Sequence, residues 1–309
     1  MRLRLEAWNP DYALPQVGLD DSSSVDGVVT DLEPPWQPLE PPAREWPVLY
    51  FVDGRQRIDA VVANEHGQRA LLVTLAAGAL VRDDAGIRLA GEPRVERVLL
   101  YPDGHEFGPV EIGPFYYRPV ALKGIHDLRM LAAKVNEQMR TLEARLAQEL
   151  QGGLVVLDGP IFVAPGLLPR PGVIGYAKTM WQRYLPPAEE RILSLLAPCQ
   201  RTPVFRIPHN ARRPLELFSW YIRLPLNPTA PFHSGAALLR VETPAGDLEH
   251  ARALADLSVG LLCGMASSPS RDPRAPQNLI PVGGLELWLG RHMGQAEVVR
   301  RRILQGLFS

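Results

Sequence analysis

Two aspartates occupy the same local setting, each after an apolar run and directly before a glycine. Asp53 stands in YFVDG and Asp158 in LVVLDGP. A carboxylate at the end of a buried strand, with a glycine beside it, can face a ligand that approaches the backbone closely. If the two strands are neighbours, both carboxylates lie at one end of a sheet. The alternative is that each Asp-Gly pair only makes a turn, as we expect at Asp103-Gly104.

A third carboxylate lies between these two in the chain. Apolar residues recur at three- and four-residue spacing over residues 126–150, which predicts a long helix with one buried face. Glu143 directly follows one of them, Leu142, so we expect it at the edge of that face. Three crowded carboxylates repel one another unless a cation compensates them. Oxygen-only ligands suit Mg²⁺ or Mn²⁺, and two such ions about 3.5–4 Å apart assist phosphodiester cleavage.

The surrounding pattern predicts an α/β fold, a mixed β-sheet flanked by helices. Residues 48–77 predict three strands joined by short turns, and residues 94–120 predict a β-hairpin, part of an insertion over about 80–120. The segment GLVVLDGPIF is typical of a buried central strand. The further predicted strands are 170–180, 214–226 and 236–244, and the further predicted helices are 186–197, 248–266 and about 282–307.

The first 47 residues differ from the rest of the chain. They contain eight prolines, so we expect a proline-rich arm without regular elements, followed by one domain over 48–309. The arm is either a solvated leader lying over the core or a docking peptide with Trp36 and Trp46 as anchors.

Composition excludes several classes of protein. The 309 residues include 33 basic and 34 acidic groups, so a histone-like grip on nucleic acid is excluded, whereas a local basic channel is not. The longest apolar run, 71–81, is too short to span a bilayer, and no apolar leader is seen at the N-terminus. The chain has no P-loop, HExxH or GxSxG motif and no CxxC pair. We expect a cytoplasmic protein.

The chain resembles the NurA family of DNA nucleases, within the ribonuclease H-like fold. The resembling segments are FVDG at 51–54, RTLEARLAQEL at 140–150, LVVLDGPI at 154–161, GVIGYAK at 172–178 and RDPRAPQNLIPVGGLE at 271–286. The resemblance implies a metal-dependent deoxyribonuclease, an exonuclease that can also cut internally, with Mn²⁺ or Mg²⁺ and two ions as the expected cofactor. It further implies a homodimer that works with a HerA-like hexameric ATPase in processing DNA ends during recombinational repair.

The resemblance also assigns roles to residues. Asp53, Glu143 and Asp158 match the metal ligands, and Tyr176 and Lys178 match the tyrosine or lysine that follows the DGP strand in the family. A lysine there can hold the scissile phosphate, or it can be an ordinary surface lysine.

Further residues are candidates for contacting DNA, because loop residues near such sites often carry function. They are Arg55, Arg271, Arg274 and Asn278.

One family feature is missing here. Many members carry an Ala-His pair near the last helix, with the histidine at the metal site, whereas PQNLIPVGGLE has no histidine before His292. The fourth site residue is therefore Asn278, Glu286 or His292. The missing histidine also keeps open a second hypothesis, a non-catalytic DNA-binding or scaffold subunit. A sugar-kinase or actin-like ATPase is disfavoured, because DGRQRIDA and DGPIFVAP lack the Gly/Thr-rich phosphate loops of those proteins.

Overall fold

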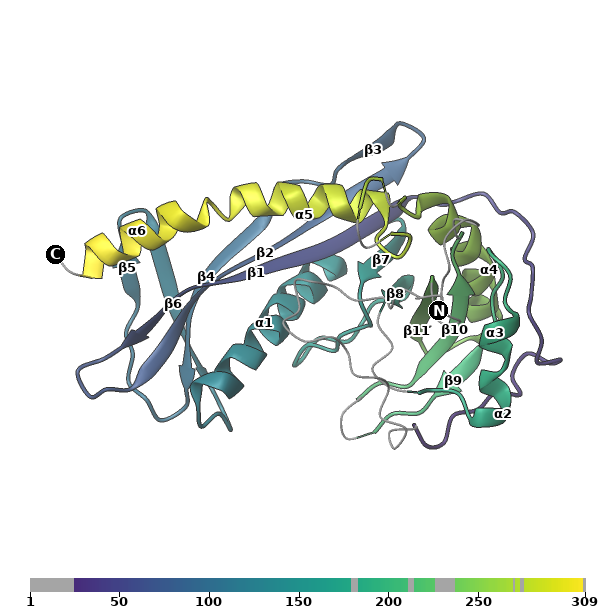
Figure 1. The fold of residues 1–309 in the computed structure, drawn as a ribbon, viewed down its shortest axis with the longest axis horizontal. Helices are drawn as coiled ribbons and strands as arrows, with labels where there is room; N and C mark the ends of the chain where they lie inside the picture. The colour runs from purple at the N-terminus through teal and green to yellow at the C-terminus, as the bar shows by residue number, and fades with distance from the viewer. Residues whose placement is uncertain are drawn as a thin grey trace, which may run out of the picture. The chain divides into compact units, whose positions relative to one another are not determined.

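The computed structural model describes residues 25–178, 183–210, 214–225, 237–268, 270–272 and 275–307 (Figure 1). The chain forms two compact units. The first contains the chain up to Leu49, Gly152–Val163 and Pro169–Gly283, and the second contains Tyr50–Gln151, Ala164–Leu168 and Gly284–Ser309. The predicted arm over 1–47 and domain over 48–309 are a different kind of division and stay a prediction.

The strands of the second unit form both antiparallel and parallel pairs. They are β1 (Leu49–Ala63), which begins one residue before the unit does, β2 (Arg69–Asp83), β3 (Gly86–Leu89), β4 (Arg94–Pro102), β5 (Val110–Ile112) and β6 (Phe115–Leu122). Their order is β5-β6-β4-β2-β1, with β3 paired to β2. β2 and β4 are antiparallel, with Leu71 opposite Leu100, whereas β4 and β6 are parallel.

Helices cover both faces of this part of the sheet, which is why β2 is buried along nearly its whole length. Helix α1 (Leu128–Glu149) packs on β2 and begins at Asp127, whose carboxylate accepts the Met130 N–H at 2.7 Å. Helix α5 (Ile280–His292) packs through Leu285 and Leu289 against Ala76. Helix α6 (Ala296–Leu307) follows α5 and contacts β5 (Figure 1).

The first unit has its own strands and helices. These are β7 (Leu154–Asp158), β8 (Val173–Ala177), β9 (Phe205–Ile207), β10 (Leu217–Arg223), β11 (Leu238–Pro244), α2 (Pro187–Glu190), α3 (Ile192–Leu195) and α4 (Leu248–Met265). The strand order is β7-β8-β11-β10-β9, and only β7 and β8 are parallel. The Leu154 N–H donates to the Val48 carbonyl at 2.9 Å, so the chain leading into β1 lies next to β7.

Residues 25–47 pack on the rest of the first unit and form isolated bridges there, Val29 with Arg206 and Leu39 with Arg201. The indole N–H of Trp36 donates to the Glu189 carbonyl at 3.0 Å. Trp46 packs on α4, where a Cβ added at Gly264 would come within 3.1 Å of its ring. Both tryptophans therefore contact their own chain.

The predicted α/β fold class is confirmed, and the described elements follow the ribonuclease H-like order of antiparallel strands, a long helix, and a strand ending in an acid. Other predictions are wrong. Residues 49–63 form one strand instead of two, and residues 94–120 do not form a simple hairpin, because β6 returns parallel to β4 and pairs with β5. The predicted helices at 186–197 and 282–307 are each two helices, and β5 and β9 are short strands that the pattern does not separate.

Among the described residues, no helix is both long and apolar enough to cross a membrane.

Candidate functional site

Asp53 lies within β1 as its fifth residue, and its side chain is buried. The expectation that Asp53 ends its strand is therefore wrong, and so is the turn interpretation of its Asp-Gly pair. Gly54 is needed for another reason. A Cβ at Gly54 would lie 2.7 Å from Oε1 of Glu143 and 2.9 Å from Cγ of Met139, so only a glycine allows α1 to approach β1 this closely.

Glu143 reaches β1 through that approach. It is buried, 6% exposed, among the apolar residues on the inner face of α1. The guanidinium Nε of Arg140, one turn earlier, lies 3.9 Å from its carboxylate. A glutamate in the buried stripe of a helix is uncommon unless it is paired or functional. The structure thus brings Glu143 to the residue next to Asp53.

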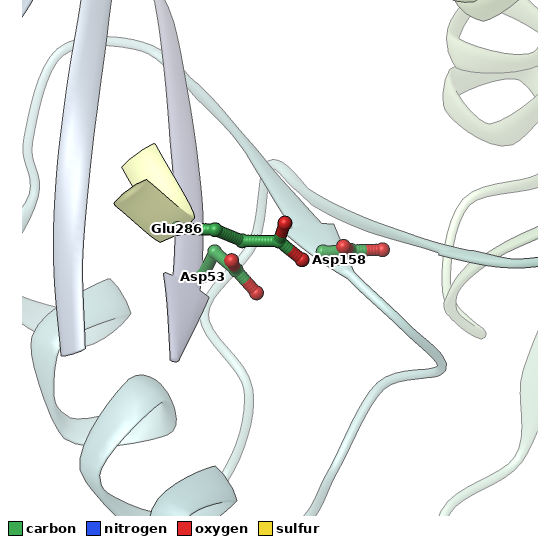
Figure 2. Close-up of side chains that lie close together, drawn as sticks. All are labelled: Asp53, Asp158 and Glu286. Carbon is green, nitrogen blue, oxygen red and sulfur yellow. The ribbon is translucent and has the colours of Figure 1, made fainter. Parts of the chain in front are cut away.

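Glu286 also comes to Asp53, from helix α5. The two side chains offer carboxylate oxygens that lie within 4.8 Å of each other. Figure 2 shows both carboxylates as sticks, together with that of Asp158. Arg55, two residues after Asp53, holds this part of α5: its guanidinium donates to the Glu286 carbonyl at 3.1 Å, and a Cβ at Gly290 would come within 2.8 Å of it.

Asp158 ends β7 in the first unit, as predicted, and it meets a cation there. Nζ of Lys178 donates to Oδ2 of Asp158 at 2.6 Å and to Oδ1 of Asn278 at 2.7 Å. The Asn278 amide in turn donates to Oδ2 of Asp272 at 2.5 Å. Lys178 is therefore held in place between a carboxylate and an amide oxygen.

Tyr176 lies beneath this cluster. Its side chain is fully buried on β8, with the Lys178 ammonium 5.5 Å from the centre of its ring. Asn278 also has no exposed surface. These two positions suit residues that support Lys178 rather than residues that touch a ligand directly.

The other predicted site residues are Arg271, Arg274 and His292. Arg271 is exposed in the turn that begins at Ser268, and Arg274 is outside the described residues. His292, one of the three candidates for the fourth position, is exposed, and its ring packs on Trp288 while Nδ1 lies 3.0 Å from the Trp288 carbonyl.

Sequence reasoning missed two features of the site. The role of Gly54 as a contact point for a helix was not predicted, because Asp-Gly is a common turn pair. Asp272 was not identified, because its place six residues before Asn278 does not by itself show that the two side chains meet. Glu286 was found only as one of three alternatives, and its acidic side chain in an otherwise apolar GGLELW segment is the one signal that marks it.

Comparison with known proteins gives one family. The model of the NurA domain matches residues 103–282, which is 180 of the 309 residues and includes Glu143, Asp158 and Lys178. A search of curated proteins finds no match. Among solved structures, the crystal structure of the NurA nuclease from Sulfolobus solfataricus aligns over 82% of this chain and 81% of that chain, with 11% identity and a TM-score of 0.47. Because the family model covers more than half of its length, this chain belongs to the NurA family.

Proposed function

We propose that this protein is a divalent-metal-dependent DNA nuclease that hydrolyses phosphodiester bonds. The observation that carries the proposal is the gathering of carboxylates around Asp53, with Glu286 within 4.8 Å and Glu143 against Gly54. Carboxylates this close together, two of them buried, repel one another unless a cation compensates them. An all-oxygen donor set fits Mn²⁺ or Mg²⁺. Membership of the NurA family supports the same reaction.

Asp53, Glu143 and Glu286 would hold a divalent metal, for which we propose two ions. We also propose Asp158 as a metal ligand, and its match to the family supports this role. Bound ions would supply Lewis acidity and a water activated at neutral pH. The carboxylates fix where that chemistry takes place.

The cationic residues have separate tasks in this proposal. Lys178 balances Asp158 and, with its ammonium held by Asn278, presents a positive charge to a DNA phosphate. Tyr176 supports Lys178 from below. Arg55, Arg271 and Arg274 remain proposed phosphate contacts, and Arg55 also fixes α5 at Glu286.

Cleavage of end-labelled linear DNA tests the proposal. The wild-type protein is incubated with Mn²⁺, Mg²⁺ or EDTA, beside Asp53→Ala, Asp158→Ala and the exposed turn variant Asp103→Ala as matched control. We expect metal-dependent degradation that both site variants lose and the control keeps. An absence of cleavage by the wild type, alone or with a HerA-like ATPase, together with retained DNA binding, would favour the scaffold hypothesis instead.

The finer parts of the function are also proposals. We propose an exonuclease that can cut internally, acting as a homodimer with a HerA-like hexameric ATPase on DNA ends in cytoplasmic recombinational repair. Family membership supports this assembly. Light scattering of the purified protein tests the dimer. Co-purification with the ATPase, and its effect on the rate of cleavage, test the partnership.

A further inference from the structure

The turn that follows Asp158 lies directly on the neighbouring strand of the first unit. Gly159 has a φ of +116°, and its N–H donates to the Tyr176 carbonyl at 3.0 Å. Beneath the turn, β8 carries Gly175. A Cβ at this position would lie 2.7 Å from the Gly159 carbonyl oxygen and 2.9 Å from the Ile161 nitrogen. The absence of a side chain at Gly175 therefore creates the space in which the turn sits.

A buried carboxylate fixes the far end of this turn. Oε1 of Glu242, on β11 opposite Gly175, accepts the Ile161 N–H at 2.6 Å. Glu242 is 1% exposed. A charged acceptor bonded to a backbone N–H is stronger than a neutral one, so the Ile161 nitrogen has one well-defined position.

Glu242 is balanced by a buried arginine on the same strand. The Arg240 guanidinium is hydrogen-bonded to Oε2 of Glu242 and lies 4.1 Å from the centre of the Tyr184 ring. Burial alone lowers the pKa of Arg240, but Glu242 and the nearby tyrosines raise it by more, so Arg240 stays charged. Burying such a pair is costly, and apolar replacements often serve stability equally well. Stability alone therefore does not explain why the Arg240–Glu242 pair is buried here.

We propose that Glu242, held by Arg240, is a positioning residue that fixes the Asp158 carboxylate through the turn from Asp158 to Ile161. The inference rests on the proposed metal-dependent function, because it assigns the turn the task of aiming a metal ligand. Groups that orient the ligands of a metal typically change its affinity by about 10–100-fold when they are removed.

Two pairs of variants separate positioning from stability. Glu242→Gln and Glu242→Ala both remove the charge that balances Arg240, but only Gln keeps an oxygen that can accept the Ile161 N–H. Gly175→Ala pushes on the turn without changing any charge. Its control is Val241→Ala, which shortens a fully buried side chain of β11 that lies on the face opposite Arg240 and Glu242.

The measurement is Mn²⁺ affinity by electron paramagnetic resonance, with thermal melting of each variant alongside. We expect Gly175→Ala to bind Mn²⁺ about tenfold more weakly than Val241→Ala does, and Glu242→Ala more weakly than Glu242→Gln. If Gly175→Ala binds as the wild type does, or no more weakly than Val241→Ala, the positioning role is overturned even if the Glu242 variants do not fold. A wild-type protein that binds no Mn²⁺ would instead overturn the proposed metal site, and this inference with it.

Discussion

Asp53 and Asp158 have neighbours of opposite charge. In the second unit, Asp53 has carboxylates as neighbours, with Glu286 within 4.8 Å and Glu143 against the adjacent Gly54. In the first unit, Asp158 meets the ammonium of Lys178 at 2.6 Å. Carboxylates that lie close together favour the binding of a cation from solution. The charge of Asp158 is instead balanced by a lysine of the protein itself. The two units therefore differ in what stands beside a candidate metal ligand: other carboxylates at Asp53, and an ammonium at Asp158.

We expect the largest loss of cleavage rate when a methyl group is added at Gly54, where β1 and α1 are in close contact. Gly54→Ala places a methyl group 2.7 Å from the Glu143 carboxylate, so Glu143 must move. A shift of about 1 Å in a catalytic group can cost about a hundredfold in rate, and we expect a loss of that order in Mn²⁺-dependent cleavage. The control is Gly108→Ala in the same unit, where an added Cβ meets nothing within 4 Å. Unchanged cleavage by Gly54→Ala would mean that Glu143 is not part of the site.

The next test asks whether Glu286 belongs to the carboxylate group. Glu286→Gln removes one negative charge from beside Asp53, and we expect Mn²⁺ to bind about thirtyfold more weakly, as judged from the range for residues around metal sites. Isothermal titration calorimetry measures the affinity. Glu297→Gln, an exposed residue on α6, is the matched loss of charge and should leave the affinity unchanged. Equal behaviour of the two variants would remove Glu286 from the site.

Removing the Lys178 ammonium from beside Asp158 should change the Mn²⁺ affinity in the opposite direction. Lys178→Met abolishes the ammonium at Asp158, so we expect Mn²⁺ affinity to rise by at least about fivefold, which corresponds to the roughly 1 kcal/mol between two unit charges about 4 Å apart in bulk water. Cleavage should nevertheless slow, because the proposed phosphate contact is lost. Lys134→Met on the surface of α1 removes the same charge elsewhere and should change neither quantity. A fall in affinity in Lys178→Met would show that the lysine supports metal binding instead of competing with it.

The smallest effect concerns the stability of the first unit. It tests whether the carboxylate of Glu33 is stabilised by Arg201 of the same unit. Burial raises the pKa of Glu33, but hydrogen bonds from Arg201 and from the Val204 N–H lower it by more, so its pKa lies below the ordinary value of 4.5. A lowered folded-state pKa contributes stability above the unfolded value, and this is lost as the pH falls through the folded value.

Glu33→Gln should therefore lower the free energy of unfolding at pH 7 by about 1 kcal/mol, because Arg201 keeps its bond to Asp256. The difference from the wild type should shrink below pH 4.5, as chemical denaturation at several pH values can show. Glu40→Gln, exposed in the same segment, is the control. A difference that grows on acidification would contradict the assignment.

Local patterns in the sequence predicted what local physics determines. The apolar stripe of residues 126–150 predicted α1 and placed Glu143 at its buried face, and the apolar run before Asp158 predicted β7. The course of β1 through Asp53 was not predictable in this way. Gly54 is there because a helix distant in sequence packs against it, and the same dipeptide elsewhere in the chain, at Asp103-Gly104, does form a turn.

Long-range polar contacts were beyond the sequence for a similar reason. Lys178 and Asn278 are 100 residues apart, and no periodicity or spacing records that their side chains meet. The parallel pairing of β4 and β6 was also hidden, because a short connection between two strands normally indicates an antiparallel hairpin. Candidate metal ligands could be proposed from residue types, whereas the contacts of Lys178 with Asp158 and Asn278 required the fold.

The division of the chain into two units has a consequence for how the protein is made. Each unit is assembled from separate stretches of sequence, and the first is complete only at Gly283 while the second needs residues beyond Gly284. During synthesis the first unit cannot be completed before Gly283 has left the ribosome, and the second cannot be completed before the segment that begins at Gly284 has followed. Fragments that end between Asp158 and Gly283 should therefore be poor substitutes for the protein, and chaperone dependence is expected to be greatest for truncated chains.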